Sequence, residues 1–491
     1  MAGALPAGNG KIQVKFLVDK EKRKVVFAES GKEFVDVLLS FLTLPLGTIV
    51  RLLGKESSLG CFDELYKSVE TLDASHFQTK ACKHMLLHPR SAAGRLQEDP
   101  VVRTDETNHR NIWVCGQKEC FSDMFYYSSV PDVPCWQCGK SMDLLWSWNW
   151  QKIGGGTQDD GAFVRGGMTY ATTDNLQIVP ANTDNLMYLL RDLEIENVTM
   201  LEEQTIELGL DEVKSLLKRS LLSDQPLTGV IFNQSDEHTG TIEPPFTDVK
   251  VNTDNDPNSN SNVSKVKLLV SEINQSVVHA EVDEEFCSTL FSFLTLPLGH
   301  VIKVLGESSS ISCMDNLYKS VEHSLSDCIK SDQCRNMLLF PRLAPFFSSD
   351  YFLRCDEVLP IVSSVTCCSP CIRNCTPFVL KEMKCSHGKT KLLAVNPKFP
   401  TTTTEAGGGY AKGPGKFLVT NELGVVPFSL INSFRALKEK EHSVSNLVTK
   451  EFTFTEAEVL NLLKAALVSR EALSLVCLPN KQKRRPHHPH Y

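Results

Sequence analysis

A long internal repeat constrains the fold of this chain more than any other feature of its sequence. The segment 40–47 reads SFLTLPLG, and the same eight letters return at 292–299, an offset of 252 residues. The same offset relates LYKSVE at 65–70 to 317–322, and it holds without a gap from Lys15 to Arg90. A repeat of this length predicts two versions of one structural unit, a tandem duplication.

The repeat divides the 491 residues into two copies. We expect copy one over residues 11–234 and copy two over residues 265–480. Residues 235–264, between the copies, are rich in Asp, Asn, Ser, Thr and Pro and predict a flexible linker. Residues 481–491 are polar and basic and predict a disordered tail.

Each copy is predicted to combine hairpins and helices, which is the α+β class. Alternating apolar residues from Ile12 to Val18, a charged turn and a second apolar run predict a β-hairpin. The spacing of Ser30 and Glu33 is that of a capping box before a helix, which Pro45 must interrupt in FLTLPLG. We expect the leucines of that motif to be buried, and a strand followed by a capped helix to close each copy.

The middle of copy one contains a metal-binding pattern of cysteines, in a zinc-ribbon-like segment over residues 111–142. Its cysteines follow the spacing C-x4-C-x14-C-x2-C, and they are Cys115, Cys120, Cys135 and Cys138. Two short-spaced thiol pairs on tight turns can direct four sulfurs at one tetrahedral Zn²⁺. Structural zinc is therefore the expected cofactor, against the alternative that four reduced cysteines simply lie together in a core.

The corresponding segment of copy two, residues 355–389, is Cys-rich but degenerate. Opposite CWQCGK stands Cys385-Ser-His387-Gly-Lys, which is one residue shorter. Whether this segment binds metal stays open, and so does the choice of ligands. The candidates are Cys355, Cys367, Cys368, Cys371, Cys375, Cys385 and His387.

Cysteine usage and the N-terminus predict a protein of the cytoplasm or nucleus, not a secreted one. The 17 cysteines are odd in number and spread over a long chain, unlike a small disulfide scaffold. The first residues lack the basic and apolar regions of a secretory signal. The longest apolar stretches fall short of the roughly 20 residues that a transmembrane helix needs.

These motifs together resemble the plant-specific domain of unknown function 674 family. The resemblance rests on the opening Lys15–Asp19, on FLTLPLG in both copies, on LYKSVE, on the MLL-x-PR motif ending at Arg90 and on the four-cysteine segment. It covers nearly the whole chain and implies a plant protein with one or more tandem copies of the unit. It implies no activity, substrate or catalytic residue.

Three functional classes remain open. The leading hypothesis is a non-enzymatic, zinc-binding interaction or scaffold module with a protein partner. The second is nucleic-acid binding through the ribbon, since all five Trp lie between positions 113 and 150. The net charge of −8, and a balance of −1 over residues 103–152, argue against it. The third is an enzyme with an unrecognised site, for which the sequence names no catalytic residue. No pattern decides the oligomeric state.

Overall fold

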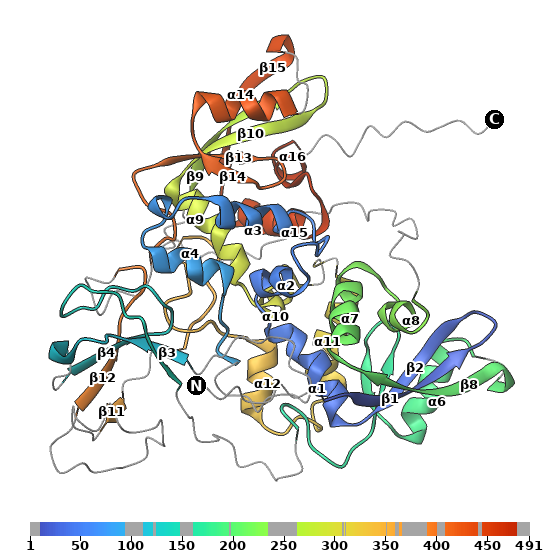
Figure 1. Ribbon diagram of the computed structural model, residues 1–491. Helices are drawn as coiled ribbons and strands as arrows, with labels where there is room; N and C mark the ends of the chain where they lie inside the picture. The colour runs from blue at the N-terminus through green and yellow to red at the C-terminus, as the bar shows by residue number, and fades with distance from the viewer. Residues whose placement is uncertain are drawn as a thin grey trace, which may run out of the picture.

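The computed structural model shows two sheet-and-helix lobes on either side of central helices, with a smaller third sheet beside them (Figure 1). Helices and strands are mixed throughout, so the expected α+β class is confirmed. We call residues 10–233 the first half and residues 263–478 the second half. The residues that the structure describes are 10–93, 111–120, 124–147, 161–195, 198–233, 263–306, 309, 311–349, 351–358, 363–365, 390–399, 408–439 and 444–478.

The first half builds an antiparallel five-stranded sheet, sheet one. The predicted hairpin is confirmed, because β1 (Ile12–Asp19) pairs antiparallel with β2 (Lys24–Ser30). Every second side chain of β1 from Ile12 to Val18 is buried, as the alternation requires. The strand order is β7-β6-β2-β1-β8, with β6 at Tyr170–Thr173, β7 at Ile178–Pro180 and β8 at Leu201–Leu208.

The second half builds sheet two, which has the equivalent order β14-β13-β10-β9-β15. The burial pattern along β9 (Ser264–Ser271) is identical to that along β1. Strand β9 begins at the last residue of the expected linker; residues 235–262 and the expected tail lie outside the described residues. The other strands are β10 at Ser276–Asp283, β13 at Lys416–Thr420, β14 at Val425–Pro427 and β15 at Leu447–Phe454.

The FLTLPLG motif forms the same helix break in both halves, as predicted. In the first half, α1 (Lys32–Ser40) passes through a 3-10 turn and ends, and Pro45 precedes α2 (Leu46–Leu52). In the second half, α9 (Glu284–Ser292) and α10 (Leu298–Leu305) repeat this arrangement. The leucines before the two prolines, Leu44 and Leu296, are only 7% and 1% exposed, so the prediction of burial is also confirmed.

The capping box predicted at Ser30 is wrong, whereas the capped helix predicted to close copy two is confirmed, with Thr455 as its N-cap. Ser30 is the last residue of β2 and pairs with Tyr170, so the helix starts one residue later, with Gly31 as its N-cap and no side-chain cap. Glu33 is thereby displaced from the third helical position, which a capping box needs. At the start of α15 (Glu456–Val468), the backbone N–H of Thr455 donates to Glu458 Oε2 at 3.1 Å.

The two FLTLPLG motifs contact each other at the centre of the molecule. The N–H of Leu46 donates to the carbonyl of Leu296 at 3.0 Å, and the N–H of Leu298 donates to the carbonyl of Leu44 at 2.9 Å. A Cβ on Gly47 would lie 2.9 Å from the carbonyl oxygen of Leu294, so only glycine fits this close backbone approach. The two bonds are reciprocal, so each motif donates to and accepts from the same positions of the other.

Around this centre, each half lends helices to the lobe of the other half. Ser68 of α3 accepts a hydrogen bond from the N–H of Val425 in sheet two at 2.8 Å. Reciprocally, Ser320, just after α11, accepts one from the N–H of Ile178 in sheet one at 2.9 Å. Figure 1 shows α11 beside α7 (Leu210–Leu222). At the start of α3, the N–H of Cys61 donates to the carbonyl of Ala466 in α15 at 2.8 Å. The exchanged helices are α3 at Phe62–Thr71, α4 at Lys80–Leu87, α11 at Ser312–Lys319 and α12 at Asp332–Leu339.

The remaining helices lie on the two faces of each sheet. The buried face of sheet one packs with α7 and α8, while Leu189 of α6 packs on the opposite face with Ala171 and Val179. Helices α15, α16 and α14 occupy the equivalent places in the second half. Their bounds are α6 Thr183–Asp192, α7 Leu210–Leu222, α8 Pro226–Ile231, α14 Leu430–Glu439 and α16 Ala472–Cys477.

A third sheet joins strands from the middle segments of both halves. Its order is β11-β12-β4-β3-β5, and only the contact between β4 and β12 is parallel. The register places Tyr127 of β4 opposite Ala394 of β12. The strands are β3 at Asn111–Val114, β4 at Met124–Ser128, β5 at Leu144–Ser147, β11 at Ser363–Val365 and β12 at Thr390–Ala394.

Candidate metal centre

The first cysteine pair is positioned by the end of strand β3. Cys115 directly follows the strand, and Cys120 closes a 3-10 turn at Lys118–Cys120. The N–H of Gln117 donates to Cys115 Sγ at 3.5 Å, and a hydrogen-bond donor of this kind stabilises a thiolate. Strand β3 is itself fixed from the helical core, because Arg90 lies over the ring of Trp113 and donates to the carbonyl of Asn111 at 3.3 Å.

The second pair lies on a tight turn whose ends are tied together. The N–H of Cys135 donates to the carbonyl of Lys140 at 2.7 Å, and the N–H of Gly139 donates to the carbonyl of Cys135 at 2.8 Å. Gly139 has φ +71°, a left-handed conformation that favours glycine. The glycine after CWQC is therefore needed by the turn that presents Cys138.

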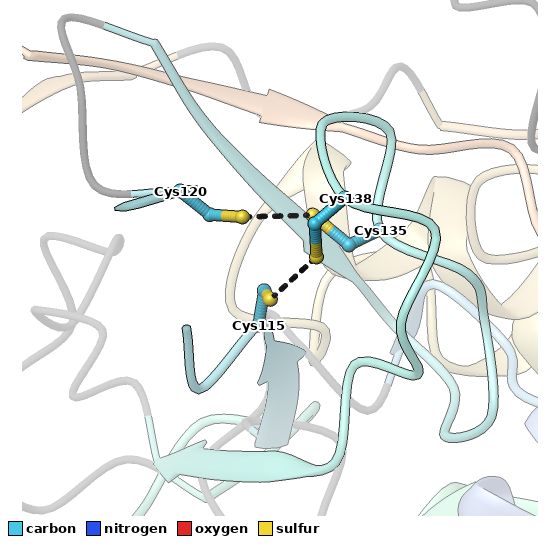
Figure 2. Close-up of side chains that lie close together, drawn as sticks. All are labelled: Cys115, Cys120, Cys135 and Cys138. Atoms are coloured by element: carbon cyan, nitrogen blue, oxygen red, sulfur yellow. Dashed lines mark hydrogen bonds between the residues drawn. The ribbon is translucent and has the colours of Figure 1, made fainter. Parts of the chain in front are cut away.

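The four sulfur atoms converge, as the sequence spacing predicts (Figure 2). All four Sγ atoms lie within 4.8 Å of one another. Cys115 and Cys138 Sγ are 3.5 Å apart, and Cys120 and Cys135 Sγ are 3.8 Å apart. Four sulfurs at about 2.3 Å from a tetrahedral zinc are about 3.8 Å from one another. The donor set and its spacing therefore fit a single four-coordinate metal ion.

The thiols differ in their surroundings and so in their acidity. Burial raises the pKa of Cys115 to about 11, and burial together with the neighbouring thiols raises the pKa of Cys120 well above its usual range. The N–H of Lys140 lowers the pKa of Cys138. Because thiolates are the metal ligands, a metal ion must displace protons from the buried thiols, and its affinity must rise with pH.

Three of the four cysteines are also part of the hydrophobic core. Cys115, Cys120 and Cys135 are 3–4% exposed, whereas Cys138 is exposed to solvent. The segment between β4 and β5 contributes three further apolar side chains to this core. They are Val130, Val133 and Met142. The cluster is therefore closed on one side by protein and open on the other at Cys138.

The second half presents no such cluster within the described residues. Cys355 is buried at 2% exposure, and its Sγ donates to the carbonyl of Pro341. The other candidate ligands of copy two lie outside the described residues: Cys367, Cys368, Cys371, Cys375, Cys385 and His387. For the part that is described, Cys355 acts as a packed core residue.

The sequence did not predict the contact that connects this segment to the second half. Strand β4, which follows Cys120, pairs in parallel with β12, and the N–H of Val395 donates to the carbonyl of Tyr127 at 2.8 Å. The only sequence signal for this contact is the short apolar run Leu392–Val395. A parallel pair between residues this far apart has no local sequence signature.

Among the described residues, no helix is both long and apolar enough to cross a bilayer. No curated protein and no solved structure matches the chain. One family model does match, over residues 8–457, which is most of the length; its description is "Protein of unknown function (DUF674)". The chain therefore belongs to the DUF674 family.

Proposed function

We propose that this protein is a non-enzymatic interaction scaffold whose four-cysteine centre binds one structural zinc ion. The observation that carries the proposal is the convergence of four Sγ atoms within 4.8 Å of one another. Soft thiolate ligands in tetrahedral array favour zinc or iron–sulfur chemistry over hard cations such as magnesium and calcium. A single closed site of four thiolates suits zinc that stabilises structure, since no ligand position remains for a substrate.

The proposed zinc ion holds together the loops that support the third sheet. It links the end of β3, through Cys115 and Cys120, to the turn that carries Cys135 and Cys138. Strand β4 lies between these two cysteine pairs and pairs with β12 of the second half. Metal binding thus stabilises a ribbon-like segment and, through it, one of the connections between the two halves.

We also infer that the two halves are copies of one ancestral unit. The support is the equivalent strand order of sheets one and two, the identical burial along β1 and β9, and the reciprocal bonds between the FLTLPLG motifs. In oligomers, reciprocal contacts of this kind arise at a two-fold interface. The protein would then be the covalently joined form of a two-fold dimer that exchanges helices.

A protein partner fits the exposed surface better than a nucleic acid. On α14, Leu430, Ile431 and Phe434 are 81%, 66% and 65% exposed, which is unusual for large apolar side chains. Phosphate binding requires a basic groove, and the chain carries a net charge of −8. The cysteines in the described part of the chain are free thiols, which fits a reducing compartment, the cytoplasm or nucleus.

Metal analysis of the purified full-length protein tests the proposal. We expect about one zinc per chain, and we expect the double variant Cys135→Ser/Cys138→Ser to lose it because two of four ligands are removed. The matched control is Cys355→Ser, a buried cysteine outside the cluster, which should keep its zinc. Protein purified without chelators that contains no zinc, or a double variant that retains it, would contradict the proposed site.

A further inference from the structure

The four cysteines of the centre are unequally accessible to small molecules in solution. Cys115, Cys120 and Cys135 are at most 4% exposed, and each belongs to the hydrophobic core. Cys138 is exposed, and so are its neighbours Gln137 and Gly139 on the same turn. A small solute that approaches the cluster from solvent therefore meets the Cys138 sulfur first.

The nearest partner of Cys138 belongs to the other cysteine pair. Its Sγ lies 3.5 Å from Cys115 Sγ, and the second short distance, 3.8 Å, joins Cys120 to Cys135. Figure 2 shows these two contacts, and each joins a cysteine of the first pair to a cysteine of the turn that carries the second pair. A disulfide needs an S–S distance of about 2.05 Å, so a Cys115–Cys138 bond requires a closure of about 1.5 Å.

We propose that the centre is an oxidant-sensitive zinc site, in which a hydroperoxide reacts at Cys138, Cys115 completes a disulfide with it, and zinc is released. This inference rests on the proposed zinc site and adds a mode of regulation to it. The oxidant is a small hydroperoxide, such as hydrogen peroxide, because only the edge of the cluster at Cys138 opens to solvent.

The reaction consumes one peroxide for each disulfide. The Cys138 sulfur attacks one peroxide oxygen, the O–O bond breaks, and the departing hydroxide takes a proton to become water. The Cys115 sulfur attacks the resulting sulfenic acid, so the S–S bond forms and the S–O bond breaks. The hydroxide that leaves takes a second proton from solvent and becomes water. The two sulfurs supply both electrons, and zinc remains divalent throughout.

Release of zinc follows because only Cys120 and Cys135 remain as ligands, and structural zinc requires four. The bond that replaces the metal ties the end of β3 to the turn, but it leaves Cys120 unattached. The short turn at Lys118–Cys120, which leads into β4, then loses its anchor. Oxidation is therefore expected to loosen β4 and its parallel contact with β12.

The test is peroxide treatment of the zinc-loaded full-length protein, with released zinc followed by a chromogenic chelator. Peptide mass spectrometry then identifies the disulfide, and hydrogen exchange follows β4 and β12. We expect one zinc released per chain, a Cys115–Cys138 disulfide, faster exchange in both strands, and reversal by a thiol reductant with added zinc. A Cys135–Cys138 disulfide, or zinc retained at peroxide concentrations that oxidise free thiols, would overturn the proposal.

Single variants separate the role of Cys138 from simple loss of the fold. Cys138→Ser should slow peroxide-driven zinc release about tenfold, because the remaining thiols are buried. The control Cys477→Ser, at a buried thiol of α16, should release zinc at the wild-type rate. If Cys138→Ser fails to bind zinc, disulfide mapping in Cys120→Ser decides, since Cys115–Cys138 should still form there. Other pairing in Cys120→Ser would count against the proposal.

The zinc content before oxidation distinguishes the two proposals. Purified protein without zinc contradicts the proposed function, whatever the peroxide does. Protein that holds one zinc, gives it up to a strong chelator and keeps it in peroxide supports the structural site and refutes the oxidant sensitivity.

Discussion

The first and second halves use the same scaffold with different chemistry at equivalent positions. Asp36 on α1 and Ser288 on α9 stand 252 residues apart. The Asp36 carboxylate accepts from the N–H groups of Ala162, Phe163 and Val164 at 2.6–3.2 Å. Ser288 Oγ accepts from the N–H groups of Tyr410 and Ala411 at 3.1 and 3.0 Å.

Both halves therefore need a buried hydrogen-bond acceptor at this position, but only the first half has an ionisable one. In each half, the segment that donates these hydrogen bonds also contacts the other half. Val164 forms an isolated β-bridge with Ile329, and Ala411 forms one with Phe77. Asp36 and Ser288 therefore each fix the position of a segment that contacts the exchanged helices of the other half. The local chemistry differs, while the path of the chain and its contacts are the same.

We expect the largest loss of stability from a substitution at the start of an exchanged helix, at a position where the two halves differ. Gly60 has φ +47°, and a Cβ there would lie 2.1 Å from the carbonyl oxygen of Ala466. Its counterpart is Ser312, which begins α11. Gly60→Ser should lower the free energy of unfolding by about 4 kcal/mol, from a clash with backbone plus left-handed strain.

Urea denaturation of Gly60→Ser and of the reverse change, Ser312→Gly, measures this difference. Ser312→Gly should cost about 1 kcal/mol in total, from the lower helix propensity of glycine relative to serine and from the lost hydrogen bond of Ser312 Oγ to Asp224. Equal losses in the two variants would show that the halves do not differ here.

The second prediction compares the two buried acceptors directly. Asp36→Ala leaves three N–H groups without their carboxylate and should cost about 3 kcal/mol, whereas Ser288→Ala leaves two and should cost about 1.5 kcal/mol. Chemical denaturation at pH 7 measures both. A larger loss for Ser288→Ala would mean that the hydroxyl, and not the carboxylate, is the stronger anchor.

The third prediction concerns pH, because only the first half has an ionisable acceptor at this position. Burial raises the pKa of Asp36 from 3.8 to about 6 despite its three N–H donors. The folded protein then holds this proton more tightly than the unfolded chain does, so stability falls as pH rises from about 4 to about 6. The slope approaches about 1.4 kcal/mol per pH unit.

Asp36→Ser, which copies the second half, should remove this contribution. The quantity to compare is the free energy of unfolding of wild type minus that of Asp36→Ser, measured at several pH values. It should decrease between pH 4 and pH 6 and stay level above pH 7. A difference that increases with pH would mean that the pKa of Asp36 is lowered by folding.

We expect the smallest change in stability from the loss of an exposed ion pair on sheet one. Lys15 and Lys11 of the β1 region form ion pairs with Glu203 and Glu207 of β8 at 3.6 and 3.3 Å, and all four side chains are more than half exposed. Lys15→Ala should change stability by less than about 0.5 kcal/mol, and less still at high salt. Thermal denaturation at low and high salt checks this, with Lys267→Ala at the equivalent position of β9 as the control.

Sequence reasoning predicted the local elements well and their assembly poorly. The alternation in β1, the break at Pro45 and the convergence of Cys115, Cys120, Cys135 and Cys138 follow from spacing, which residues close in the chain determine. The exchange of α3 and α11 between lobes, and the pairing of β4 with β12, depend on packing between distant segments. Even a local prediction can fail for this reason. Ser30 has the spacing of an N-cap, but it pairs with Tyr170 in the sheet instead.

We propose above all that the four cysteines hold one metal ion in a tetrahedral sulfur environment. X-ray absorption at the zinc edge, on full-length protein as purified, measures the ligands and their distances directly. We predict four sulfur ligands at about 2.3 Å. Nitrogen or oxygen ligands at about 2.0 Å in place of sulfur, or the absence of zinc from the protein, would contradict it.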